Sequence, residues 1–179
     1  MLRGGWRTAR AEYDSLKQVP NANVLLTTIA IRQISSCDTG ILRNRLFSIS
    51  GELGLTLDET DKAISHLVSL GLILISDDIF RTKHISYANR IVKESLSNEN
   101  SATWSCTIDT LVTTVRDDIT SLKGAYWLLD VICLTDGVRF NQREKLRPIL
   151  EPLMSRCRDE WRQTEWAVGC VSCLWGLFD

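Results

Sequence analysis

The sequence predicts a mainly α-helical protein with one small β-hairpin, and three observations lead to this fold class. Apolar residues recur at spacings of three and four along most of the chain, as on one face of a helix. Gly accounts for only 10 of the 179 residues and Pro for only 3, which disfavours a turn-rich all-β architecture. Two short segments, 72–76 and 79–83, are separated by two residues, a spacing typical of a hairpin.

Composition and charge narrow the class of protein. Apolar residues make up 44% of the chain and charged residues 24%, which is enough to bury a core and argues against disorder. The 21 basic and 22 acidic side chains leave a net charge of -1, which disfavours a strongly basic nucleic-acid-binding protein. The N-terminus has no signal-peptide pattern, and the longest apolar run, 166–178, is shorter than the roughly 20 residues of a membrane span. We therefore expect a cytoplasmic protein without a membrane segment.

The elements of the N-terminal half follow one another at short intervals. Residues 1–22 predict an arm that ends near Pro20. The mostly apolar segment 23–36 predicts a well-buried helix, and 41–50 predicts a second, shorter helix. Between them, the sequence Asp-Thr-Gly that ends at Gly40 predicts a turn.

The next helix carries the clearest start signal in the chain. Thr56 is followed three residues later by Glu59, which is the pattern of a capping box. Apolar residues then recur at helical spacing as far as Gly71, a residue that suits a helix C-terminus. We therefore expect a helix that begins after Thr56 and ends before Gly71.

A hairpin and a further helix complete this unit. Segments 72–76 and 79–83 predict two strands that a pair of Asp residues joins tightly. Residues 85–96 return to a helical period. The order helix, short helix, helix and β-hairpin is that of a winged helix, which we expect over residues 23–96.

The polar segment 97–101 marks the expected boundary to a second domain, an all-helical bundle over 102–179. Its predicted helices include one that starts near Trp104 and an almost wholly apolar one over 122–134. Five of the six tryptophans fall in this part of the chain. Because the sequence ends at Asp179 directly after a last apolar helix, we expect either a partner surface there or a longer chain.

Few residues form a pattern typical of catalysis or metal binding. The six cysteines are scattered, and we expect reduced thiols that pack as small apolar side chains. A single CxxC occupies 170–173, but His66 and His84 lie far from it in sequence, so a zinc or redox site is the weaker interpretation. The acidic pair at 117–118 predicts solvated charge rather than acid–base chemistry. We therefore expect a protein that is not an enzyme and holds no metal.

The predicted winged helix carries acids where a DNA-binding one carries cations. Its third helix, which would enter the major groove, opens with Asp58, Glu59 and Asp61, and the hairpin tip adds two more acids. Across 40–90, six acidic side chains balance six basic ones. Since DNA affinity depends on neutralising phosphates, we expect this unit to bind protein rather than DNA. The three acids also have a purely structural interpretation, because acids cap a helix start and complement its dipole.

Residues 80–95 have the sequence FRTKHISYANRIVKES, which resembles the winged-helix region of STAND-type P-loop NTPases. That group includes NACHT and NB-ARC proteins and bacterial anti-phage relatives, and the layout of 23–96 is similar to its winged-helix module. The resemblance implies that His84 contacts the terminal phosphates of ATP or ADP, with Arg81 as a second contact. The residues themselves favour a structural interpretation, in which His84 at the strand end caps backbone carbonyls and Arg81 is a solvated strand residue.

The chain departs from that family at one essential point. It contains no GxxxxGKS or GxxxxGKT phosphate loop, so we expect it to bind no cofactor alone and to contact a nucleotide only through an upstream nucleotide-binding domain. The resemblance then implies a non-catalytic regulatory module whose winged helix packs on that domain in signalling or anti-phage defence. Two alternatives remain: a winged-helix transcriptional regulator that dimerises through its C-terminal helices, and a phage or plasmid accessory protein that binds protein.

Overall fold

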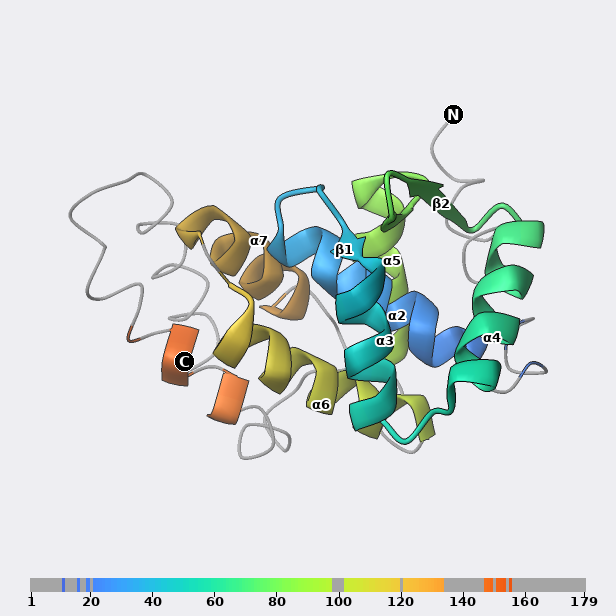
Figure 1. Ribbon diagram of the computed structural model, residues 1–179. Coiled ribbons are helices and arrows are strands. Elements are labelled where there is room, and N and C mark those ends of the chain that lie inside the picture. The colour runs from blue at the N-terminus through green and yellow to red at the C-terminus, as the bar shows by residue number, and fades with distance from the viewer. Residues whose placement is uncertain are drawn as a thin grey trace.

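The computed structural model describes residues 21–97, 102–119 and 121–133, with the separate positions 11, 16, 19, 147–149, 151–153 and 155. It is mainly helical with one small antiparallel sheet, as composition and periodicity predict (Figure 1). Its elements are α2 (Ala22–Ser35), β1 (Ile41–Leu42), α3 (Arg43–Glu52), α4 (Leu57–Ser69), β2 (Ile73–Ser76), β3 (Ile79–Thr82), α5 (Ile85–Leu96), α6 (Ala102–Asp117) and α7 (Leu122–Cys133). Most of the predicted arm, the CxxC at 170–173 and the last predicted helix lie outside the described residues.

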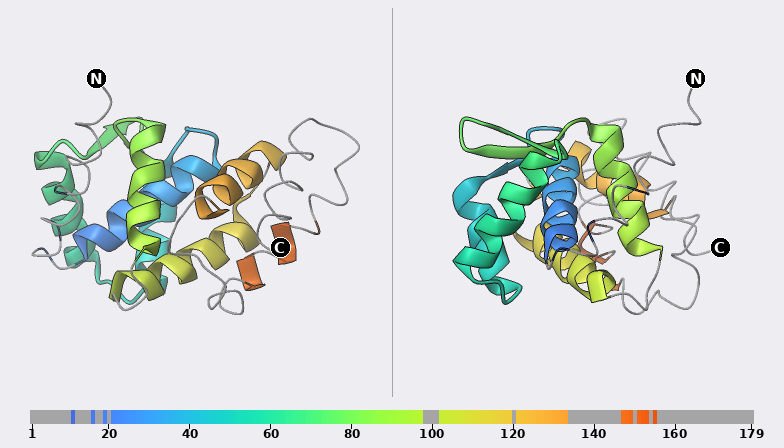
Figure 2. Two further views of the ribbon diagram at one scale, coloured as in Figure 1. Left: turned by 180° about the vertical axis from the view of Figure 1, so that it is seen from behind. Right: turned by 90° about the vertical axis from the view of Figure 1, so that its right-hand side faces the viewer.

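Helix α2 forms the centre of the fold. Its side chains are buried continuously from Leu25 to Ser35, including those of Arg32 and Gln33. Helices α5, α6 and α7 pack against it, and it also contacts α3, α4, β1 and β3. Figure 2 shows α5 crossing α2, with α6 and α7 beside it. The mostly apolar segment 23–36 predicts this burial correctly, because a helix surrounded by other elements needs apolar residues on every side.

A single hydrophobic cluster runs through the described part of the chain. It includes Ile29 of α2, Ile91 of α5, Leu111 of α6 and Leu128 of α7, all with no exposed surface. The helices before and after the predicted boundary at 97–101 therefore share one core. A division of the chain into two domains at that boundary stays a prediction.

Helix α7 approaches the end of α2 at Gly124. A Cβ atom added there would lie 1.9 Å from the carbonyl oxygen of Ser35, far inside van der Waals contact. Only glycine permits this approach, since any other residue would push the two backbones apart. The position of α7 thus depends on glycine at position 124.

The predicted helix over 41–50 is wrong in its first turn. Ile41 and Leu42 form strand β1, which pairs antiparallel with Phe80 and Ile79 of β3, and helix α3 begins only afterwards. Gly40 makes this pairing possible, because its φ of 102° and its lack of a side chain let the backbone pass close to the carbonyl of Phe80. The sheet order is β1-β3-β2.

The capping box and the hairpin form as predicted. The backbone N–H of Thr56 donates to Oε2 of Glu59 at 2.8 Å, and the N–H of Glu59 donates to Oγ1 of Thr56 at 3.3 Å. Asp77 and Asp78, with φ values of 49° and 61°, connect β2 to β3 in the left-handed conformation of a type I′ turn. Asp tolerates this conformation better than most residues, which explains its presence at both positions.

No helix within the described residues has both the length and the apolar character that a membrane crossing requires.

Candidate interaction surface

The two residues that the family resemblance singles out lie at the junction of β3 and α5. His84 is the N-cap of α5: its Nδ1 accepts a hydrogen bond from the N–H of Ser86 at 3.1 Å and lies 2.5 Å from the Ser86 hydroxyl. The ring therefore caps a backbone amide of the helix. Arg81 lies in β3 opposite Leu74, and both Arg81 and His84 are exposed. Neither lines the two cavities described below.

A buried amide anchors the hairpin to the central helix. Oε1 of Gln33 accepts hydrogen bonds from the N–H and the hydroxyl of Thr82, at 2.7 and 2.9 Å. The same side chain donates through Nε2 to Asp38 at 2.6 Å. Sequence reasoning missed this contact, because a polar residue within an apolar helix gives no sign of which strand it meets. The contact between Gln33 and Thr82 holds the hairpin in position against α2.

The exposed side of α4 is acidic at its first turns, as the sequence predicts. Asp58 and Asp61 are exposed, and the nearest cation, Lys62, is bound to Asp58 with an Nζ–Oδ2 distance of 2.5 Å. Glu59 takes part in the capping box, and the hydrogen bonds from Thr56 lower the pKa of its carboxyl group. The first turns of α4 therefore present two exposed carboxyl groups, those of Asp58 and Asp61, that take no part in the capping box. We call the exposed side chains of α4 the α4 face; its members are Leu57, Asp58, Glu59, Asp61, Lys62, Ser65, Val68 and Ser69.

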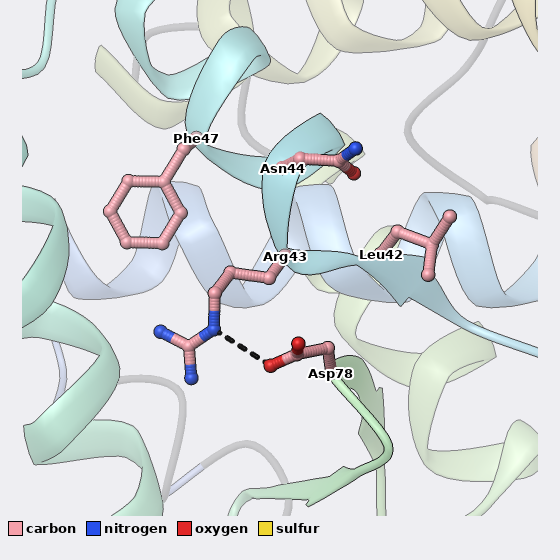
Figure 3. A pocket seen from close by; sticks show the side chains of 5 residues that line it. All are labelled: Leu42, Arg43, Asn44, Phe47 and Asp78. Carbon is pink, nitrogen blue, oxygen red and sulfur yellow. Dashed lines mark hydrogen bonds and ion pairs between the residues drawn. The ribbon is translucent and has the colours of Figure 1, made fainter.

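A groove of about 460 Å³ lies between the start of α3 and the tip of the hairpin (Figure 3). An ion pair crosses it: Nε of Arg43 donates to Oδ1 of Asp78 at 3.1 Å. The Arg43 guanidinium also lies 5.2 Å from the centre of the Phe80 ring. In Figure 3, Phe47 and Leu42 lie on either side of this pair. Among the described residues that line this groove, Arg43 is the one cation, and it is already paired with the hairpin tip.

The exposed large apolar side chains come from one stretch of the sequence. Among the described residues, all of the large hydrophobic side chains that are exposed lie on the stretch from β1 to β2. They are Leu42, Leu57, Val68, Leu70, Leu74 and Ile75. Leu57 and Val68 lie on α4, and Leu74 and Ile75 lie on β2.

A cluster of charged side chains, one of them buried, joins α2, α3 and the end of α6. Arg32 of α2, only 3% exposed, forms an ion pair with Asp118, and Arg45 of α3 binds the same carboxylate with distances of 3.2 and 3.0 Å. Although burial opposes it, the hydrogen bonds from Arg45 and Arg32 hold the pKa of Asp118 below its usual value. The expectation of solvated charge at 117–118 is therefore wrong for Asp118. Its arginine partners are remote in sequence, and nothing local to the pair points to them.

A cavity of about 240 Å³ adjoins this cluster and is lined by Arg32, Arg45 and Asp118 together with the turn that precedes β1. Asp118 faces both guanidinium groups, and Arg45 also lies 3.7 Å from Glu52 and 3.8 Å from Asp117, so the two cations have acidic partners within the protein. Within the described part of the chain, no group of three or more His, Cys, Asp or Glu side chains is placed to hold a metal ion. Cys37 and Cys106 are free thiols and half-buried.

The predicted likeness to STAND-type NTPases rests on residues 80–95 and on the order of the elements. Comparison of the chain with protein-family models, with curated proteins and with solved structures gives no match.

Proposed function

We propose that this chain is a regulatory protein-interaction module built on a winged helix, and that the α4 face contacts its partner. The winged-helix assignment is supported by the order α2, β1, α3, α4, β2, β3, α5 and by the sheet order β1-β3-β2. In this arrangement α3 and α4 correspond to the helix-turn-helix pair, and α4 is the helix that such proteins present to their target.

The observation that carries the proposal is the chemistry of α4. A helix that enters the major groove needs cations against the phosphates, because phosphate neutralisation supplies most of the affinity for DNA. Here the first turns present Asp58 and Asp61, and Lys62 is engaged by Asp58. Leu57 and Val68 add exposed apolar surface to the same helix. Carboxylates around apolar side chains suit a protein surface that carries complementary cations.

The partner in this proposal is a nucleotide-binding domain of a STAND-type signalling or anti-phage defence protein. His84 and Arg81 would then face that domain and donate hydrogen bonds to the phosphate oxygens of its ATP or ADP. Their exposure is compatible with this role. The His84 ring is already committed through Nδ1 to the start of α5, so it would offer the nucleotide at most its other nitrogen. Because the sequence contains no GxxxxGKS or GxxxxGKT phosphate loop, the partner domain would hold the phosphates in this proposal.

Site-specific photo-crosslinking in the native host tests the proposal. A photoreactive phenylalanine replaces Val68 on α4 in one strain and Ser105, an exposed residue of α6, in a control strain. We expect an adduct with a second protein from position 68 that survives nuclease treatment, and no such adduct from position 105. An adduct at position 68 that nuclease removes would instead support the DNA-binding regulator, and equal adducts from both positions would contradict a role for α4.

A mobility shift separates the two functions with purified protein. We expect no complex between the chain and a short DNA duplex at low salt, where electrostatic binding is strongest. A salt-sensitive complex that is abolished by Lys62→Ala would overturn the proposal in favour of DNA binding.

A further inference from the structure

We propose that strand β2 is an open sheet edge that pairs with β2 of a second copy of this chain, joining two three-stranded sheets into one. The inference concerns the hairpin and does not rest on the partner of α4. Among the described residues, strand β2 pairs with β3 alone in the sheet order β1-β3-β2, so one of its sides has no neighbouring strand within that part of the chain.

The register of the hairpin shows which backbone groups point outward. Ser76 pairs with Ile79 across the two-residue turn, so these residues form the hydrogen-bonded pair that closes the hairpin. Bonded and non-bonded pairs alternate, which makes Leu74 the next β2 residue bonded to β3. The N–H and C=O groups of Ile73 and Ile75 then point away from β3.

The other strand of the hairpin supports this alternation. Thr82 is the register partner of Ile73 in a non-bonded pair, so its N–H should point away from β2, on the far side of β3. That N–H donates to Gln33 of α2. Among the described residues, no side chain or backbone group outside the sheet bonds to the backbone of Ile73 or Ile75.

The side chains of β2 do nothing to protect this edge. Leu74 and Ile75 are 44% and 43% exposed, and they point to opposite faces of the sheet. Natural proteins commonly block an open edge with Lys, Pro or a bulge, because an exposed apolar edge strand pairs with other chains. The strand has the sequence ILIS and contains no such residue.

The sequence of the edge is complementary to itself. In an antiparallel pairing centred on Leu74, Ile73 of each copy lies opposite Ile75 of the other, and these are the residues whose bonding groups point outward. Leu74 meets Leu74 of the second copy in a non-bonded pair, where side chains lie closest. Asp77 falls opposite Gly71, so the carboxylates of the two copies do not face each other. A second copy therefore satisfies both the hydrogen bonds and the charge pattern of this edge.

The dimer is expected to be weak, because a strand of 4 residues buries less than the ~1,200 Å² of a typical stable interface. Disulfide trapping detects such a contact in the full-length chain. Under mild oxidation with glutathione disulfide, Leu74→Cys should form covalent dimers at least about tenfold faster than the control Leu70→Cys, because pairing raises the effective concentration of the two thiols. Leu70 is 47% exposed and lies just outside the strand, which makes it a matched control.

A second variant separates strand pairing from chance collision. Adding Ile75→Pro to Leu74→Cys removes an outward N–H and leaves the bonds between β2 and β3 in place, so the fast dimer should disappear while thermal unfolding still shows a folded protein. Equal trapping rates at positions 74 and 70 would overturn the proposal. Fast trapping at position 74 that Ile75→Pro does not slow, in a folded variant, would overturn it as well.

Discussion

Arg45 of α3 holds Asp118, just past the end of α6, through two parallel hydrogen bonds of 3.2 and 3.0 Å. The same carboxylate forms an ion pair with the buried Arg32 of α2. One acidic side chain therefore ties together three helices that come from both sides of the predicted boundary at 97–101. The loss of this carboxylate would leave the charge of Arg32 inside the protein with no counterion at this site.

Asp118→Asn should therefore destabilise the fold by about 3 kcal/mol, the order found when one member of a buried ion pair is removed. Denaturant unfolding followed by circular dichroism measures this loss. The matched control is Asp117→Asn, because Asp117 is more exposed and pairs mainly with the neighbouring Arg116. Equal losses for both variants would show that the burial of Arg32 is not what makes Asp118 important.

The contribution of Asp118 should also depend on pH in a defined direction. Its pKa is lowered in the folded protein, so the stabilisation is complete above the unfolded pKa of about 3.9 and is lost as the pH falls through the lower, folded value. The difference in unfolding free energy between wild type and Asp118→Asn should thus be constant near neutral pH and shrink below about pH 4. A difference that stays the same down to acidic pH would contradict the ion-pair explanation.

The glycine at the contact of α7 with α2 gives a steric prediction. Gly124→Ala places a Cβ atom against the backbone of Ser35 and should cost at least about 1–3 kcal/mol, as overpacking does. Gly51→Ala is the control, since nothing lies within 4 Å of the added Cβ in α3. That change should raise stability by about 0.5–1 kcal/mol through helix propensity. Thermal unfolding of both variants should therefore shift in opposite directions.

The capping box predicts a smaller, local effect. Thr56→Ala removes the oxygen that accepts the N–H of Glu59 and should cost about 1 kcal/mol. Ser65→Ala, on the exposed side of the same helix, should cost nothing, because Ala is the better helix former. Hydrogen exchange at the first turn of α4 should accelerate in the first variant alone. Unchanged exchange there would mean that tertiary packing, not the cap, fixes the helix start.

Local sequence signals predicted the elements that depend on neighbours in the chain. The spacing of Thr56 and Glu59 fixes the start of α4, and two Asp residues between short strands fix the hairpin turn. Both signals work because the interacting groups lie within a few residues of each other. The residues that form the sequence pattern are therefore the same residues that make the contact.

Contacts between distant residues could not be predicted in this way. The first two residues of the segment 41–50 join the sheet only because β3 lies beside them, and apolar spacing does not distinguish such a strand from a helix start. The partners of Asp118 and of Gln33 lie 73 and 49 positions away, for Arg45 and Thr82 respectively. A single sequence shows the polar residue but not its distant partner, and hence misses these two contacts between elements.

The anchor of the hairpin and the seat of α7 lie two residues apart on α2, at Gln33 and Ser35. A helix packed on all sides has no room to bend between such close points and moves only as a rigid rod. Any force that tilts the hairpin must also displace the α7 contact, and a load on α7 must be felt at the hairpin. The last turn of α2 thus couples the position of the hairpin to that of α7.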